Sequence, residues 1–262
     1  MTILQAIILG IVEGVTEFLP ISSTGHLILT SKLFGIADSD FTKSFEIAIQ
    51  FGAILSVVVL YWKKFLSDKE TLKRVLVAFI PTAIFGFLLY KILKTYLLSS
   101  ALLVVWSLAL GGIVLILFEK WHIKKSYKTD GREFYKIDEI NYRKSFLIGV
   151  FQSLAIIPGI SRSGATIIGG LLMGISRQAI VEFSFLLAVP TMAAATAYDL
   201  YKSAGQFSFS DFHVLAIGFI VSFIVAIISI QWLLQFIKNH TFISFGVYRI
   251  VIALIFWFLV VG

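Results

Sequence analysis

The chain has 262 residues, of which 58% are hydrophobic and 14% charged, whereas a soluble domain is roughly 45–50% apolar and about 25% charged. With a mean hydropathy of +0.94, this composition excludes a water-soluble globule and predicts an integral membrane protein. The sequence has no cysteine, which excludes disulfides and thiolate chemistry, and its net charge of +7 is attributed to membrane topology, so no nucleic-acid partner is expected.

Two apolar regions do not have the pattern of simple membrane spans. Residues 1–34 and 145–176 are rich in Gly, Ser and Thr and are interrupted by a proline and by charges. We expect each to form a re-entrant helical hairpin, although a further crossing within 1–43 is an alternative. The other apolar segments predict transmembrane helices over 47–62, 75–90, 95–118, 183–198, 214–237 and 241–262.

Basic residues predict the orientation of these spans. Segments 63–74 and 119–144 contain five and eight Lys or Arg, and with Arg177 and Lys238 the predicted inner side has 15, against five on the outer side. Because such residues concentrate in cytoplasmic loops, both termini are expected outside. The predicted fold is all-α: a single polytopic membrane domain, 1–262, made of two inverted repeats, 1–118 and 145–262, joined by a basic cytoplasmic loop, 119–144. Each repeat has a re-entrant hairpin and about three transmembrane helices.

Short matching motifs support the repeat. Pro20 to Gly25 resembles Pro158 to Gly164 with one inserted residue, and Glu13 and Gln152 each precede the motif glycine by 12 positions. A chance match of Ser- and Gly-rich strings is the alternative. Inverted repeats with broken helices place a binding site near the bilayer midplane, so we expect the two motifs to meet there.

The first motif combines acidic and hydroxyl side chains. Glu13 and Glu17 lie four residues apart before Pro20, on one helical face, and could hold a cation; a capped helix end at the membrane interface is the alternative. The following residues suit an anion at the N-terminus of a helix beginning near Leu27, although serines are also ordinary helix caps. They are Ser22, Ser23, Thr24, Gly25 and His26.

The second motif repeats the hydroxyl-rich turn and adds an arginine. Arg162 offers a planar guanidinium that binds phosphate with two nitrogens, and its alternative role is a structural ion pair with Glu13 or Glu17. The remaining polar or small residues of this turn are Ser161, Ser163, Gly164 and Thr166. Carboxylates able to hold a divalent cation, hydroxyls, a histidine and an arginine together indicate phosphoryl transfer, on a substrate with a long apolar tail.

Both motifs closely resemble the signatures of the undecaprenyl-diphosphate phosphatases, the bacitracin-resistance family. The similar segments are Glu13 to His26 and Pro158 to Thr166, and the similarity extends over nearly the whole chain, except for the basic loop. The resemblance implies hydrolysis of undecaprenyl diphosphate to undecaprenyl phosphate in the bacterial plasma membrane, with a divalent cation, Mg²⁺ or Ca²⁺, and a site open to the extracytoplasmic face.

The resemblance also implies roles for individual residues. Glu13 and Glu17 would be the acidic, metal-holding pair, Ser23 and His26 the nucleophile and its partner, and Arg162 the diphosphate clamp, while Ser161, Ser163 and Thr166 would line the second turn. A metal-bound water is the alternative nucleophile. The competing function is a flippase or transporter of a polyprenyl phosphate or diphosphate lipid. The oligomeric state is left open, with a homodimer as one candidate.

Overall fold

The computed structural model describes residues 1–37, 39–92, 100–128, 137–203 and 212–261, which form helices and turns with no β-strand among them. Two pairs of short helices contain the predicted re-entrant regions: α1 (Ile3–Thr16) with α2 (Ser23–Leu33), and α7 (Tyr142–Ser153) with α8 (Arg162–Leu172). The long helices are α3 (Asp40–Leu60), α5 (Lys69–Ile92), α6 (Ala101–Lys128), α9 (Arg177–Ser203) and α10 (Phe212–Phe236). The expected all-α membrane fold is confirmed.

Shorter elements connect these helices. Helix α4 (Trp62–Ser67) follows α3, and 3₁₀ turns cover Ile137–Glu139 and Leu154–Ile156. Helix α11 (Ile243–Phe256) continues into a π-helical turn, Trp257–Val261.

Five described helices are long and apolar enough to cross a membrane, with spans of 20 to 25 residues. They correspond to the predicted spans in the middle of the chain, with ends that differ by up to six residues, as for Ala101 against the predicted start at 95. Residues 95–99 of that prediction lie outside the described residues. The predicted C-terminal span is a shorter apolar helix of 17 residues, Ile243–Leu259, which is at the lower limit for crossing a hydrocarbon core about 30 Å thick.

The boundaries of the predicted basic loop and of α2 need correction. Helix α6 continues to Lys128, so the segment predicted as a loop from 119 begins as helix, and α7 already covers its last residues; residues 129–136 lie outside the described residues. A helix can project beyond the bilayer, where its charged side chains are solvated or paired, as Glu119 is with Arg177 at 2.8 Å. Helix α2 begins at Ser23 rather than near Leu27.

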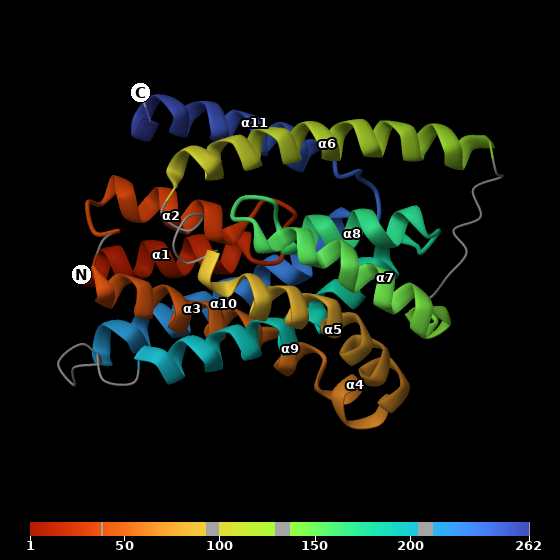
Figure 1. Ribbon diagram of the computed structural model, residues 1–262, viewed down its shortest axis with the longest axis horizontal. Coiled ribbons are helices and arrows are strands. Elements are labelled where there is room, and N and C mark those ends of the chain that lie inside the picture. Colours follow the sequence, from red (N-terminus) through yellow and green to blue (C-terminus); the bar gives the residue numbers. More distant parts are fainter. Residues whose placement is uncertain (38, 93–99, 129–136, 204–211, 262) are drawn as a thin grey trace.

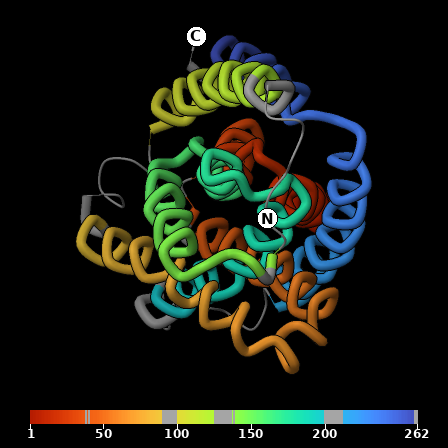
Figure 2. Tube along the Cα trace, turned by 90° about the vertical axis from the view of Figure 1, so that its right-hand side faces the viewer, coloured from red at the N-terminus to blue at the C-terminus, as the bar shows by residue number. Residues whose placement is uncertain are grey.

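The long helices run roughly parallel, with both termini at one end of the bundle and α4 at the other (Figure 1). Helices α6 and α11 pack together along one side, above the first hairpin (Figures 1 and 2). On the other side of that hairpin α10 packs against both α1 and α3, while α5 packs against α7. Both hairpins are therefore enclosed by longer helices. The inverted relation of the two halves stays a prediction.

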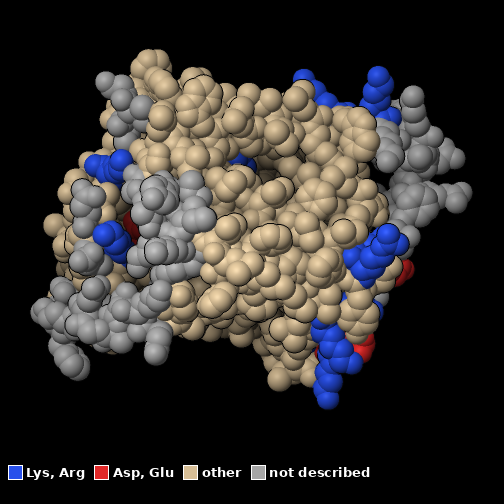
Figure 3. Space-filling view, viewed as in Figure 1, with Lys and Arg blue, Asp and Glu red and all other residues tan. Residues whose placement is uncertain are grey.

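The surface has the charge distribution of a membrane protein. On the face shown in Figure 3, Lys and Arg gather mainly at the two ends, and the broad band between them is almost entirely made of other residues. Exposed apolar side chains on the surface of the long helices include Phe87 of α5, 75% exposed, and Ile228 of α10, 60% exposed. Apolar side chains with such exposure are expected where a helix faces lipid.

Candidate active site

The two motif turns share an uncommon backbone conformation. Ser22 and Ser161 are the only described non-glycine residues with positive φ, at 72° and 81°. Each is the N-cap of the helix that follows, α2 or α8, and each hydroxyl accepts a hydrogen bond from a glycine N–H, Gly25 at 3.4 Å and Gly164 at 3.1 Å. Left-handed φ costs a non-glycine residue about 1–3 kcal/mol, so its presence in both turns points to a functional requirement.

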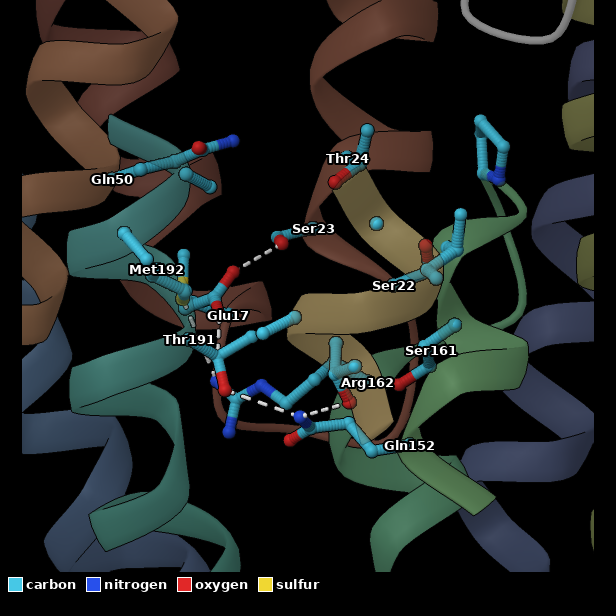
Figure 4. A pocket seen from close by; sticks show the side chains of 18 of the residues that line it. Glu17, Ser22, Ser23, Thr24, Gln50, Gln152, Ser161, Arg162, Thr191 and Met192 are labelled. Carbon is cyan, nitrogen blue, oxygen red and sulfur yellow. Dashed lines mark hydrogen bonds and ion pairs between the residues drawn. The ribbon is translucent and has the colours of Figure 1, made fainter. Parts of the chain in front are cut away.

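Both turns line one cavity of about 490 Å³, which confirms that the motifs meet (Figure 4). The predicted site residues that line it are Glu17, Ser22, Ser23, Thr24, Ser161 and Arg162. Because the first residues of α2 and α8 lie at this cavity, the free N–H groups and positive dipole ends of two helices favour an anion there.

An ion pair crosses the cavity from one motif to the other. The Arg162 Nη2 atom lies 2.7 Å from Glu17 Oε1, and its Nη1 donates to the Ser184 carbonyl at 2.8 Å. The other oxygen of Glu17 accepts a short hydrogen bond from the Ser23 hydroxyl (Figure 4). The ion pair between Arg162 and Glu17, which was the alternative role predicted for Arg162, is therefore present. Glu17 connects the guanidinium of the second motif to the Ser23 hydroxyl of the first.

Glu13 has a different environment from Glu17. Its side chain is fully buried in α1 and does not line the cavity, although it lies close to Glu17. Neither of its carboxylate oxygens accepts a hydrogen bond from a donor among the described residues. A buried carboxylate without partners is costly, and a cation or a proton would satisfy it. The described residues contain no cluster of three or more His, Asp or Glu. A cation at this site would therefore depend on the Glu13 and Glu17 pair together with oxygens of its ligand, which is a donor set that suits Mg²⁺ or Ca²⁺.

His26 does not contact Ser23, although both are predicted site residues. Its Nδ1 lies 2.8 Å from the Ser22 carbonyl oxygen, and its Nε2 lies 3.0 Å from the Tyr248 hydroxyl of α11. The imidazole stacks on the Tyr248 ring with a centroid distance of 5.6 Å. His26 is therefore directed toward α11 and does not line the cavity.

The remaining predicted residues lie behind the turns. The Ser163 hydroxyl donates to the Leu19 carbonyl at 2.7 Å, and the Thr166 hydroxyl is 2.6 Å from that of Ser184. Together with Gly25 and Gly164, these residues do not line the cavity. Their hydrogen bonds join the second motif to the first motif and to α9.

Sequence reasoning missed a polar cluster from three further helices. Gln152 of α7 lines the cavity and its Nε2 donates to the hydroxyls of Thr82 in α5, at 2.8 Å, and Thr191 in α9, at 3.1 Å (Figure 4). The Gln152 Oε1 atom is buried without a partner among the described residues. The alignment of Gln152 with Glu13 was the available signal, but nothing local in the sequence indicated the two threonines.

One wall of the cavity is apolar. Helix α5 contributes Phe79, Ala83 and Phe87, and α9 contributes Ala194 and Ala195. The cavity therefore combines a charged, hydroxyl-lined part with a part that suits a hydrocarbon chain.

Comparisons with known proteins match almost the whole chain. The family model described as "Bacitracin resistance protein BacA" matches residues 6–255. The chain is 57% identical to the undecaprenyl-diphosphatase of Sulfurihydrogenibium sp. (strain YO3AOP1), over 98% of this chain and 99% of that protein. It is also 57% identical to the undecaprenyl-diphosphatase of Aquifex aeolicus (strain VF5), over 98% of both chains. The undecaprenyl-diphosphatase of Wolinella succinogenes is 50% identical, again over 98% of both chains.

Proposed function

Since this chain belongs to the bacitracin resistance protein BacA family, we propose that it removes the terminal phosphate of undecaprenyl diphosphate. The product, undecaprenyl phosphate, is the lipid carrier of cell-wall precursors, and its recycling would give bacitracin resistance. The protein would act in the bacterial plasma membrane, on a substrate that reaches the cavity from the extracytoplasmic side.

The observation that carries this proposal is the joining of both motifs in one cavity with an apolar wall. Arg162 and the N-termini of α2 and α8 favour a diphosphate. Phe79 and Phe87 on α5 provide apolar surface for the first part of a polyprenyl tail. A soluble phosphate ester would not need such a wall.

Ser23 is the candidate nucleophile because its hydroxyl already donates to Glu17. When the Ser23 oxygen bonds to the terminal phosphorus, its proton passes to Glu17 and the bridging P–O bond breaks, so that undecaprenyl phosphate leaves with the bridging oxygen. Water then hydrolyses the phosphoserine, releases inorganic phosphate and restores the Ser23 hydroxyl. Arg162 stabilises the negative charge that accumulates on the phosphoryl oxygens in both steps.

Glu13 and Glu17 would hold the divalent cation. The unpartnered oxygens of Glu13 fit this role, and a bound cation would neutralise charge on the diphosphate. The carboxylate that binds the cation and the guanidinium that binds phosphate then lie on opposite motifs, so neither motif alone would complete the site.

The test is phosphate release by purified protein in detergent from undecaprenyl diphosphate and Mg²⁺ or Ca²⁺. Wild-type protein and an Arg143→Lys control, altered at an exposed arginine of α7, should release inorganic phosphate, whereas Arg162→Lys should release about 100-fold less. No phosphate release by wild-type protein would refute the proposal. The assay has no second compartment, so lipid flipping would give no signal, and the names of the relatives favour the phosphatase over the flippase.

A further inference from the structure

Arg249 of α11 is a buried cation whose partners are main-chain carbonyls. Its side chain is 2% exposed, and none of the described carboxylates forms an ion pair with it. Its guanidinium instead donates five hydrogen bonds, with all three nitrogens in use. A charged side chain in this position is expensive in a membrane, so its contacts require a functional explanation.

The carbonyls that Arg249 binds belong to both motif turns and to α6. Its Nη1 donates to Pro20 at 3.3 Å and Ile160 at 2.9 Å, and its Nη2 donates to Gly159 at 2.8 Å. Pro20 and Gly159 each lie two residues before a cap serine. One guanidinium therefore fixes the equivalent position of both turns.

Helix α6 supplies the space for this guanidinium. Arg249 also donates to the carbonyls of Ser107, at 3.0 Å, and Leu108, at 3.3 Å. A Cβ atom added to Gly111 would overlap Nη2 of Arg249 and would lie 2.7 Å from its Cζ. A glycine is therefore required at this position for Arg249 to reach the turns.

Tyr248, the preceding residue of α11, holds the first motif through His26. A carbonyl oxygen can only accept, so the His26 Nδ1 carries the hydrogen that is donated to Ser22, and Nε2 accepts from the Tyr248 hydroxyl. Both ring nitrogens are then occupied, while the Ser23 hydroxyl donates to Glu17. In this arrangement His26 has no nitrogen left to accept the Ser23 proton.

We infer that α11 is the positioning element of the active site: Arg249 holds both motif turns directly, and Tyr248 holds the first turn through His26. This inference rests on the proposed function and assigns His26 a positioning role, not the role of proton acceptor for Ser23. None of the three side chains lines the cavity. They set the direction of the two cap serines and of the residues that follow them, Ser23 and Arg162.

Substitution of His26 separates positioning from proton transfer. Asn places its side-chain N–H where His26 has Nδ1, so His26→Asn retains the bond to Ser22, loses the contact with Tyr248 and cannot exchange a proton near neutral pH. We expect His26→Asn to keep kcat within about tenfold of wild type with an unchanged pH–rate profile, and His26→Ala to lose about 100-fold. If a limb of the pH–rate profile disappears in His26→Asn, His26 transfers a proton. If His26→Asn is as inactive as His26→Ala, the bond to Ser22 does not position the turn. Either result overturns the assignment made here.

A substitution that displaces Arg249 without removing it tests its contact with the two motif turns. Gly111→Ala should lower kcat by about tenfold or more with little change in KM, because the turns move while the cavity wall is retained. Leu110→Ala, at a neighbouring residue of α6 that is 55% exposed, is the matched control and should be unchanged. Wild-type kcat in Gly111→Ala would overturn the role of Arg249.

If Gly111→Ala does not fold, Arg249→Lys replaces it, since lysine keeps the charge but cannot bind both turns and α6 together. Its kcat should fall while its yield and thermal stability in detergent remain measurable, and an unchanged kcat would again overturn the inference. Wild-type protein that releases no phosphate from undecaprenyl diphosphate refutes the proposed function itself. Active wild-type protein with unaffected variants refutes only the role of α11.

Discussion

The left-handed backbone at Ser161 leads to a prediction in which glycine and alanine have opposite consequences. The hydroxyl of Ser161 caps α8 through the Gly164 N–H at 3.1 Å, an interaction that contributes about 1 kcal/mol. Its φ of 81° costs a residue with a Cβ about 1–3 kcal/mol. Ser161→Ala loses the cap and keeps the strain, so we expect it to destabilise the protein by about 1 kcal/mol.

Ser161→Gly loses the same hydroxyl but releases the strain. Glycine serves as an N-cap almost as well as serine, within a few tenths of a kcal/mol. Because glycine increases the conformational entropy of the unfolded state, it also lowers the free energy of unfolding by about 0.4–1 kcal/mol. The glycine variant should therefore be more stable than the alanine variant by about 1–3 kcal/mol, and each kcal/mol corresponds to a Tm higher by about 2–4 °C. Thermal unfolding of both purified variants in detergent measures this difference.

Ser163 provides the control for this comparison. It lies in α8 two residues later and lacks positive φ, and its hydroxyl is lost equally in both variants. Within a helix alanine is better than glycine by about 0.5–1 kcal/mol, so the order of stability should reverse at Ser163. The same order at both positions would refute the argument that the backbone of Ser161 is strained.

Three further predictions concern the site and its orientation. Arg162→Lys keeps the charge but loses the planar guanidinium, so turnover should fall about 100-fold while the protein still inserts, and near wild-type turnover would exclude the clamp role. Glu17→Gln should abolish most activity and Glu13→Gln less, and a metal titration that is unchanged in both would show that the pair does not bind the cation. With a membrane-impermeant thiol reagent on intact cells, a cysteine at Ser203 should react and one at Thr129 should not; Thr129 lies outside the described residues, and the reverse labelling would invert the predicted topology.

The sequence predicted the members of the site better than their contacts. Glu17 and Arg162 were identifiable because a charge within an apolar segment is costly and needs a partner. Their pairing across 145 residues of sequence was one of two alternatives. The identity of the hydroxyl that Glu17 binds was not predictable, because it depends on the side-chain direction of Ser23 within the turn.

His26 shows why proximity in sequence was misleading. It lies three residues after Ser23, which suggests a shared environment, but its ring is stacked on Tyr248, 222 residues away. The position of α11 beside the first hairpin is a tertiary feature that local pattern does not encode. Arg249 was visible as a charge within an apolar segment, yet its partners are carbonyls, which every residue has and which sequence therefore cannot distinguish.

The accuracy of the predicted helix boundaries was limited by a similar cause. Charge-free segments mark the part of a helix inside the bilayer, so they located the spans but not where α6 ends beyond it. The start of α2 was placed too late because the cap formed by Ser22 depends on a positive φ, which sequence favours only for glycine and asparagine. The resemblance between the two motifs still predicted that the serine turns would be equivalent.

The ion pair between Glu17 and Arg162 also has a consequence for turnover. Phosphate that binds Arg162 must compete with a carboxylate that already occupies the guanidinium at 2.7 Å. Each 1.4 kcal/mol of this competition weakens phosphate binding about tenfold. The same competition applies to the product, so the ion pair between Glu17 and Arg162 can form again as inorganic phosphate leaves. An isolated arginine in this buried position would retain its bound phosphate. Because Glu17 competes for the guanidinium, Arg162 can instead release phosphate and then bind the diphosphate of the next lipid.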